Sequence, residues 1–263
     1  MKSGLDYNAP IPECPLRYLI LSDIHANLEA FKKCTEMAEG KYDQILCLGD
    51  LVGYGPDPNA VITGIREMAR MIIRGNHDKA CCGITDAEDF NALARQATLW
   101  TRGELTPEHL AFLRTLPSGP VTMESFEMVH GSPADEDEYI FGPGQALPTL
   151  RALTTPTVLF GHTHFQGGFM LNANGRFQSI RCSSKEDGLA AVLPLEDGAH
   201  YLINPGSVGQ SRDGDWRAAF AVLDEEQRQV EYYRAPYELP ITQAKMRKAG
   251  LPDPLIRRLE LGR

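Results

Sequence analysis

Short apolar runs alternate with amphipathic stretches in the first third of the chain. The runs at residues 16–21, 44–48 and 70–73 have the length and apolar character of buried strands. Between them, apolar residues recur at helical spacing after Asn27 and after Asp57, two residue types that favour the start of a helix. Short strand–helix–strand units of this kind join parallel strands. The pattern therefore predicts a sheet whose first three strands run parallel.

The rest of the chain predicts a helical middle, a strand-rich second half and a helical end. Apolar residues recur at helical spacing near residues 90–97 and again after Thr106. From Gly167 the period changes to two, and Asn174-Gly175 is typical of a hairpin turn. Further strands are expected at residues 128–130, 158–160, 190–193, 201–203, 218–223 and 230–233, and helices at 243–248 and after Pro252.

No stretch of the sequence marks a linker between domains. Residues 1–15 hold three prolines and few apolar residues, which predicts a flexible N-terminal arm. We expect residues 16–263 to form a single domain that ends in a helical tail. A chain of 263 residues is long enough to bury a sizeable core.

Composition and charge narrow the class of partner. Hydrophobic residues make up 43% of the chain and charged residues 23%, as in ordinary soluble globular proteins. The net charge of -9 argues against a nucleic-acid polymer, which needs a basic face. The six cysteines show no spacing typical of a zinc or redox site, and no apolar run is long enough to span a membrane. We expect a cytoplasmic protein with no membrane partner. A small anionic substrate fits this net charge if a metal ion supplies positive charge locally.

Polar metal-type ligands follow five of the apolar runs. Five of the seven histidines lie in these turns, far more than chance placement would give. Carboxylates, imidazoles and one amide, without thiolates, suit borderline divalent metals. Seven ligands are too many for one ion and fit two ions that share a carboxylate. The turns carry Asp23 and His25; Asp50; Asn76, His77 and Asp78; His130; and His162 and His164.

These motifs, in this order, resemble the calcineurin-like metallophosphoesterase superfamily. The pattern is Asp-x-His, Gly-Asp-x-x-Gly, Gly-Asn-His-Asp, His-Gly and Gly-His-x-His between residues 22 and 164. The segment Asn204-Pro205-Gly206-Ser207-Val208-Gly209 is similar to one in the small bacterial and archaeal, phosphodiesterase-like members. The resemblance implies an α/β fold: a four-layer α-β-β-α sandwich of two mixed sheets flanked by helices. It also implies a two-metal site at the sheet edge.

The resemblance assigns a role to each motif residue. It implies two divalent transition-metal ions, Mn first, with Fe, Zn, Co or Ni as alternatives. It places His77 beside the scissile phosphate as a catalytic residue. Independently of the resemblance, Asp78 is either an orienting carboxylate for His77 or a helix cap. Its metal ligands are Asp23, His25 and His164 for the first ion, Asn76, His130 and His162 for the second, and Asp50 as the catalytic bridge between them.

The chain departs from the protein Ser/Thr phosphatases of the superfamily. Those enzymes carry Gly-Asp-x-x-Asp-Arg-Gly, whereas this chain has Gly49-Asp50-Leu51-Val52-Gly53-Tyr54-Gly55. The acid that orients the catalytic His and the Arg that binds phosphate are both missing there, which favours small phosphoesters over phosphoproteins. The Gly-Tyr-Gly-Pro version of this loop resembles members labelled phosphodiesterases or diadenosine tetraphosphate hydrolases.

Other residues are candidates for binding the substrate. Arg212, after the glycine-rich segment, can supply the missing phosphate contact, or it is a surface Arg in a turn. Tyr54 can cover the organic part of the substrate, or it packs on a neighbouring proline. Asn76 is a further candidate for contact with the phosphate. The aromatic residues Tyr139 and Phe141 pack over a base or join a small core cluster.

Two charged segments are expected to be solvated faces. They are the acidic run 135–138 and the basic end with Arg257, Arg258 and Arg263.

The expected function is a metal-dependent phosphoesterase. It would hydrolyse phosphodiesters, phosphomonoesters or dinucleoside polyphosphates by attack of a metal-bridging hydroxide. The alternative is a non-catalytic metal-binding scaffold for protein interaction, which typically loses ligands or the catalytic His. All seven ligands and His77 are present in this sequence. A nuclease fits the metal ligands but not the acidic charge.

Overall fold

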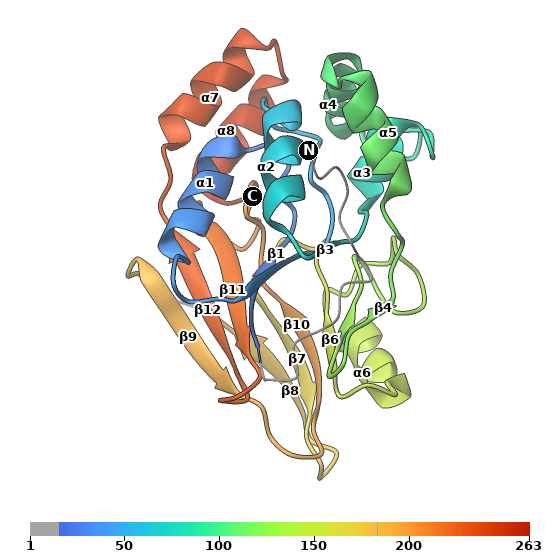
Figure 1. Ribbon diagram of the computed structural model, residues 1–263, viewed down its shortest axis with the longest axis vertical. Helices are drawn as coiled ribbons and strands as arrows, with labels where there is room; N and C mark the ends of the chain where they lie inside the picture. The colour runs from blue at the N-terminus through green and yellow to red at the C-terminus, as the bar shows by residue number, and fades with distance from the viewer. Residues whose placement is uncertain (1–15, 183) are drawn as a thin grey trace.

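Two six-stranded sheets lie face to face with helices on their outer sides (Figure 1). The architecture comes from a computed structural model, which describes residues 16–182 and 184–263. The two mixed sheets with helices outside them confirm the predicted four-layer sandwich. The expected N-terminal arm at residues 1–15 lies outside the described residues.

The first sheet contains the three strands that the sequence predicts to be parallel. Strands β1, β2 and β3 pair in parallel, and β11, β12 and β9 extend the sheet in antiparallel fashion. All of β11 is buried, because both faces of this central strand are covered. In spatial order the strands are β3 (Met71–Ile72), β2 (Gln44–Cys47), β1 (Arg17–Leu21), β11 (Ala218–Asp224), β12 (Gln229–Ala235) and β9 (Gly188–Pro194).

The second sheet also mixes parallel and antiparallel pairs. Strand β6 pairs in parallel with β5 on one side and β10 on the other, and β7 joins β10 in antiparallel fashion. Strands β7 and β8 form the hairpin predicted at Asn174-Gly175. In spatial order the strands are β4 (Val121–Thr122), β5 (Glu127–Met128), β6 (Thr157–Leu159), β10 (His200–Asn204), β7 (Gly167–Leu171) and β8 (Phe177–Arg181).

Three layers of buried apolar side chains hold the sandwich together. One lies between the sheets and includes Ile20 and Leu46 of the first sheet and Tyr201 and Ile203 of the second. A second joins the first sheet to α1 and α2, and a third joins the second sheet to α6. The helices are α1 (Leu28–Met37), α2 (Pro58–Met68), α3 (Asn76–Cys82), α4 (Ala92–Glu104), α5 (Pro107–Thr115), α6 (Pro143–Ala152), α7 (Leu239–Lys248) and α8 (Asp253–Leu261).

The two C-terminal helices return to the loops above the sheets. Helix α7 packs on α1 and α8, and buried residues of α8 share an apolar cluster with α4 and Tyr54. In Figure 1 both helices stand at the same end of the molecule as α1 and α2, whereas α6 lies beside the second sheet. The helical tail is thus packed against the loops that follow β1 and β2.

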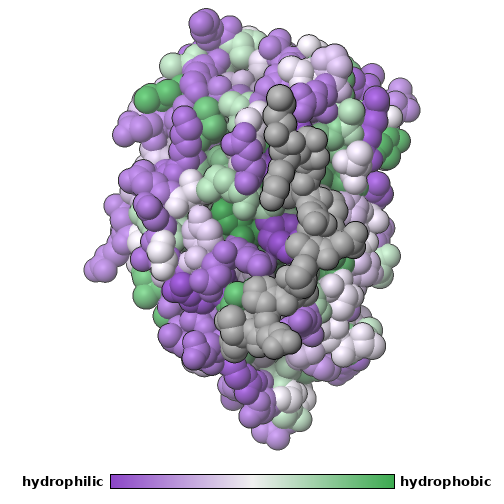
Figure 2. Space-filling model, in the orientation of Figure 1, coloured by the Kyte–Doolittle hydropathy of each residue, from purple (hydrophilic) through white to green (hydrophobic). Residues whose placement is uncertain are grey.

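Hydrophilic residues cover most of the face that Figure 2 shows outside its grey segment, with small apolar patches between them. This surface fits the ordinary content of charged residues, 23% of the chain. In the part of the chain that the structure describes, no helix combines the length and apolarity needed to cross a membrane.

Candidate metal centre

The predicted ligand turns meet where the two sheets come together. Asp23 and His25 follow β1, and Asp50 follows β2, so these three come from the first sheet. His130 follows β5 and His162 follows β6, so these two come from the second. Each turn leaves the carboxyl end of its strand, which is where α/β sheets place their binding sites.

The donor atoms fall into two groups that share one carboxylate. Within each group the donor atoms all lie within 4.8 Å of one another, and every side chain is buried. Asp50 Oδ2 belongs to both: it lies 3.7 Å from His25 Nε2 and 3.5 Å from His130 Nε2. The first group is Asp23, His25, Asp50 and His164, and the second is Asp50, His130 and His162.

The sequence-predicted amide ligand lies beside the second group. Asn76 Oδ1 is 3.3 Å from His130 Nε2. All seven predicted ligands are therefore brought to one place.

Backbone carbonyls fix how the imidazole rings face the centre. An Nδ1–H that donates to a carbonyl leaves the Nε2 lone pair free for a metal. His25 Nε2 and His164 Nε2 lie 3.2 Å apart, so two nitrogen lone pairs point at one region. The Nδ1 contacts are His25 with Val52 O at 3.1 Å, His130 with Leu48 O at 2.7 Å and His164 with Gln210 O at 2.6 Å.

Each carboxylate keeps one oxygen free. Asp23 Oδ2 accepts hydrogen bonds from the Ser22 hydroxyl at 2.7 Å and from the backbone N–H of His162 at 3.1 Å. Asp50 Oδ1 accepts one from the backbone N–H of His77 at 2.8 Å. The other oxygens, Asp23 Oδ1 and Asp50 Oδ2, are buried without a hydrogen-bond partner. An unpartnered buried carboxylate oxygen is costly. Cations at the two donor groups would satisfy both oxygens, so the residues fit divalent metals.

The charges around Asp50 support the same fit. Burial by itself raises the pKa of Asp50, but the surrounding His130, His77 and His25 bring it well below its usual value. Burial lowers the pKa of His130, but the charges of Asp50 and Asp23 raise it to about 10. The carboxylates thus attract positive charge into the centre, and a metal would replace the proton on His130.

The ligand residues share an uncommon backbone conformation. Five of them have positive φ angles, a region that costs non-glycine residues roughly 1–3 kcal/mol each. Such strain persists only where the surrounding structure holds it, and it turns the side chain out of the strand direction. The angles are 53° for Asp23, 48° for His25, 54° for Asp50, 66° for His162 and 62° for His164.

Two glycines allow neighbouring backbone to touch the ligand turns. A Cβ on Gly75 would lie 2.1 Å from Asp50 Oδ1, and one on Gly161 would lie 2.0 Å from Ser22 Oγ. No side chain fits at these distances, so glycine is required beside the Asp50 carboxylate.

The glycine-rich segment at residues 204–209 supports the ligand turns from behind. The Asn204 amide donates to the Gly161 carbonyl at 2.9 Å, and the Ser207 hydroxyl donates to the Asp23 carbonyl at 2.8 Å. The Gly209 N–H also donates to the Asp23 carbonyl, at 3.0 Å. This segment therefore holds the turns of both sheets together without supplying a ligand.

His77 lies outside both donor groups, next to the centre. Its ring centroid is 4.4 Å from that of Tyr54, 4.6 Å from that of Phe90 and 5.0 Å from that of His25. Its Nδ1 atom is buried without a hydrogen-bond partner. Burial is the main cause that lowers the pKa of His77 to about 4, so the imidazole is neutral near pH 7.

Asp78 serves as a helix cap. Its Oδ2 accepts the Gly75 N–H at 3.0 Å, and its Oδ1 accepts the Val52 N–H at 3.3 Å. Burial and the charge of Asp50 raise the pKa of Asp78 to about 7. Of the two alternatives for Asp78, the contacts therefore support the cap over the orienting carboxylate.

The loop with the acidic run is bound to α3 and is only partly solvated. Lys79 is only 4% exposed, and its ammonium contacts Glu136 at 3.0 Å and Asp137 at 2.6 Å. Arg74 also pairs with Glu136, at 2.9 Å. The Asp137 carbonyl lies 3.1 Å from His162 Nε2. The expectation of a solvated face holds for part of the run, since the Asp137 side chain is 50% exposed, whereas Glu136 is half-buried between two cations.

The expectation for Arg258 was wrong. This side chain is partly buried, and its guanidinium carbon lies 4.8 Å from the centroid of Tyr54. Tyr54 itself is 5% exposed and lies against His25 and His77. Arg212 lies 5.9 Å from the same centroid. Sequence analysis missed Arg258 because a basic residue on a terminal helix looks the same whether or not another loop covers it.

Two cavities adjoin the metal centre. One of about 370 Å³ is lined by Asn76, His77 and His162, and by Tyr54. A larger one of about 1040 Å³ is lined by Thr163, between two ligand histidines, and by aromatic residues of the nearby loops. The centre is therefore open to a small molecule.

Exposed aromatic rings stand at the edge of the larger cavity. Phe141 is 57% exposed and Phe165 is 45% exposed, and their ring centroids are 6.1 Å apart. Tyr139 stacks on Phe141 and, at 3.7 Å, on the ring of His162. Of the two alternatives for Phe141, membership of a core cluster does not fit this exposure.

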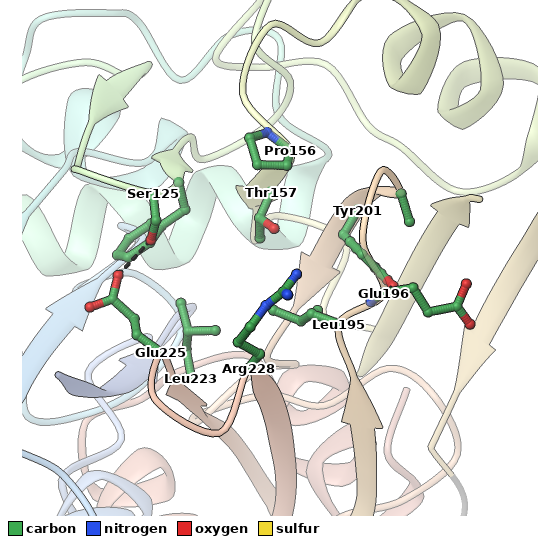
Figure 3. Close-up of a pocket in the computed structure, with 11 residues that line it drawn as sticks. Ser125, Pro156, Thr157, Leu195, Glu196, Tyr201, Leu223, Glu225 and Arg228 are labelled. Atoms are coloured by element: carbon green, nitrogen blue, oxygen red, sulfur yellow. Dashed lines mark hydrogen bonds between the residues drawn. The ribbon is translucent and has the colours of Figure 1, made fainter. Parts of the chain in front are cut away.

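A third cavity lies away from the centre. It measures about 230 Å³ and is lined by residues at the beginning of β6 and around the β11–β12 turn (Figure 3). Ser125 donates to Glu225 there, and Arg228 pairs with Asp197. Because the metal ligands follow the opposite ends of the parallel strands, this cavity takes no part in the chemistry of the centre.

Comparison with known proteins identifies the family. A model of the calcineurin-like phosphoesterase family matches residues 16–166. An uncharacterised protein of Methanocaldococcus jannaschii is 31% identical in an alignment of 255 positions, which covers 93% of this chain and 97% of that protein. The chain therefore belongs to the calcineurin-like phosphoesterases.

Solved structures agree with this assignment. The crystal structure of a metallophosphoesterase from Sphaerobacter thermophilus has a TM-score of 0.80 and 38% identity, over 95% of this chain and 100% of that one. A hypothetical protein from Pyrococcus horikoshii has a TM-score of 0.73 and 20% identity, over 94% of this chain and 98% of that one. At 20% identity, the similarity to the Pyrococcus horikoshii protein shows only that the fold is shared.

Proposed function

We propose that this protein is a binuclear metal-dependent phosphoesterase that hydrolyses small phosphoesters. One observation carries the proposal: two buried groups of metal-type donors share the free oxygen Asp50 Oδ2. Two divalent cations would supply positive charge for the phosphoryl oxygens and would activate the attacking water. The donors mix carboxylate and imidazole without thiolate, which suits Mn, Fe, Zn, Co or Ni, and we propose Mn²⁺ as the first ion to test.

The ligands would divide between the two ions as the donor groups do. Asp23, His25 and His164 would hold one ion, and His130 and His162 the other, with Asp50 between them. Asn76 would complete the second set, since its Oδ1 lies 3.3 Å from His130 Nε2. An amide is neutral, so Asn76 can also donate an N–H to a phosphate oxygen.

His77 would act on the substrate and not on a metal. It lines the cavity of about 370 Å³ beside the centre, and no carboxylate accepts from its Nδ1 atom. The negative charge of a bound phosphoester raises the low pKa of this ring. His77 would then give a proton to the leaving oxygen, which is general acid catalysis.

The organic part of the substrate would lie on the aromatic rings at the cavity edge. Phe141 and Phe165 present exposed faces there, and Tyr139 continues the row to His162. Planar groups stack on such rings. A nucleoside or aryl ester would therefore bind better than a small aliphatic ester.

A non-catalytic scaffold remains the alternative. It would keep the fold and the metals but turn over no phosphoester. The retained His77 and the open cavity beside it support an enzyme, since a scaffold needs neither.

Turnover of a panel of phosphoesters by the Mn²⁺-loaded protein tests the proposal. The panel contains nitrophenyl monoesters, nitrophenyl diesters and dinucleoside polyphosphates. We expect hydrolysis of at least one class, abolished by Asp50→Asn. Full metal occupancy with no turnover of any class would favour the scaffold.

A further inference from the structure

Two guanidinium groups meet beside the proposed active site. Arg212 comes from the turn after the glycine-rich segment, and Arg258 comes from α8 at the end of the chain. Both donate to Gln210 Oε1, Arg212 at 3.1 Å and Arg258 by a shorter contact. The ring of Tyr54 lies next to both guanidinium groups. Residues nearly fifty positions apart therefore place two like charges around one neutral amide.

The two positive charges have no negative partner among the described residues. Within 16–182 and 184–263, neither Arg212 nor Arg258 forms an ion pair with a carboxylate, and both Nε atoms are buried without a hydrogen-bond partner. The adjacent Arg257, by contrast, pairs with Asp253. Burial and the charge of Arg212 lower the pKa of Arg258 to about 10, which leaves it charged near pH 7. Partly buried like charges without a partner are costly, so an anion beside the pair would stabilise it.

The pair Arg212 and Arg258 lies next to residues of the proposed active site. Tyr54 separates Arg258 from the rings of His25 and His77, which lie 4.8 Å and 4.4 Å from its own ring. The backbone N–H of Arg212 donates to the backbone carbonyl of His164, at 3.3 Å. Arg212 is thus fixed next to a residue that would hold the first metal.

A count of charges indicates which anion fits. With two divalent cations bound, four positive charges would face the negative charges of Asp23 and Asp50 and that of the attacking hydroxide. The one positive charge that remains would be taken up by the phosphoryl group that is hydrolysed. The guanidinium groups add two more positive charges, so they call for a second anionic group close to the first.

We propose that Arg258 and Arg212 bind a second phosphate of the substrate, linked to the phosphate that is hydrolysed. The substrate class would then be esters with two or more linked phosphates, such as nucleoside polyphosphates. A guanidinium group binds two phosphate oxygens at once, and two such groups surround a phosphate well. This inference rests on the proposed function and narrows its substrate.

Competitive inhibition tests the proposal with two anions that differ by one phosphate. Orthophosphate and pyrophosphate compete with a nitrophenyl phosphoester on the full-length enzyme at saturating Mn²⁺. In Arg258→Gln, the inhibition constant of pyrophosphate should rise about 10–100-fold more than that of orthophosphate, as expected for loss of charge-assisted hydrogen bonds. The inhibition constant of pyrophosphate in Arg258→Lys should lie between those of the wild type and Arg258→Gln.

Matched variants separate binding from structure. Arg257→Gln removes the neighbouring charge on the same helix, and both constants should stay as in the wild type. Arg212→Gln should reproduce the pyrophosphate-selective effect, which keeps the test valid if Arg258→Gln does not fold. An equal rise for both anions, or no rise for either, would overturn the proposal.

A calorimetric titration of pyrophosphate into the Mn²⁺-loaded protein gives a readout without turnover. Binding that is weakened in Arg258→Gln but not in Arg257→Gln supports the subsite. If no ester is hydrolysed but this titration succeeds, the proposed function fails and the anion site stands. If esters are hydrolysed and the titration shows no difference, the anion site fails alone.

Discussion

At the scale of single residues, side chains and neighbouring backbone fix the metal centre together. Asp50 illustrates this, because one of its oxygens accepts the His77 N–H and the other faces both donor groups. Gly75 passes so close that any Cβ would strike the first oxygen. Small changes next to a ligand should therefore act on the metals.

Replacing Gly75 should weaken the binding of the metals. In Gly75→Ala the new Cβ would meet Asp50 Oδ1 at 2.1 Å and push the carboxylate out of place. We expect Mn²⁺ affinity to fall roughly 10–100-fold, as when a ligand's supporting contacts are lost. Gly144→Ala is the control, because a Cβ there meets nothing within 4 Å. Wild-type Mn²⁺ affinity in Gly75→Ala, measured by titration, would show that the close contact is unimportant.

Replacing His77 should spare the metals and slow turnover. His77→Gln removes the proposed general acid, which is worth roughly 10²–10⁴-fold in rate. The rate of hydrolysis should fall less for esters with good leaving groups, such as nitrophenyl esters, than for alkyl esters. The leaving oxygen of a nitrophenyl ester needs little protonation. Steady-state kinetics and metal analysis of the same sample decide the matter. Loss of a metal from His77→Gln would make this residue a ligand.

Sequence analysis found the metal-type residues and missed much of what surrounds them. Asp23, Asp50 and His130 were predictable because each follows an apolar run, and strand ends gather at a sheet edge. The positive φ angles of Asp23 and Asp50 leave no mark in the sequence. Arg258 was missed because the pattern of α8 shows which face is apolar, but not that Tyr54 lies opposite its polar side.

At the scale of elements, the loop between β5 and α6 is fastened to α3. Lys79 and Arg74 meet the acidic side chains of this loop, and the loop carries His130 at its start. The sequence predicted β1 and β2 well because their apolar runs are long. It gave no sign of β4, which has two residues, or of α6, which contains Pro148. Short strands and proline-containing helices depend on their neighbours more than on their own pattern.

Removing the Lys79 charge should loosen this loop. In Lys79→Met, the carboxylates of Glu136 and Asp137 lose a buried partner, which costs roughly 1–3 kcal/mol in the free energy of unfolding. Proteolysis within residues 131–139 should become faster. Lys33→Met is the control, because its partner Glu36 is 68% exposed and exposed pairs contribute little. Equal stability of the two variants in denaturant would contradict the role of Lys79.

At the scale of the whole molecule, the centre forms only when the two sheets pack together. The first sheet supplies Asp23, His25 and Asp50, and the second supplies His130 and His162. The apolar layer between the sheets, with residues such as Ile20 and Tyr201, holds the two halves in register. Metal binding should therefore depend on the intact sandwich.

Metal should in turn stabilise the sandwich. A ligand that binds only the folded state adds about 2.7 kcal/mol at a free concentration 100 times its dissociation constant. We expect Mn²⁺ to raise the midpoint of thermal unfolding and a chelator to reverse the rise. Asp50→Asn should show a much smaller rise. If Mn²⁺ does not change the midpoint of thermal unfolding of the wild type, metal binding does not depend on the folded sandwich.

The most direct test is the number of metal ions per chain in the wild type and in Asp50→Asn, together with turnover of the same samples. We predict two Mn²⁺ per wild-type chain after removal of free metal, and fewer than two in Asp50→Asn with hydrolysis lost. Asp43→Asn, which alters an exposed carboxylate paired with Arg17, should keep both ions and full activity. Two ions and normal hydrolysis in Asp50→Asn would contradict a centre bridged by this residue.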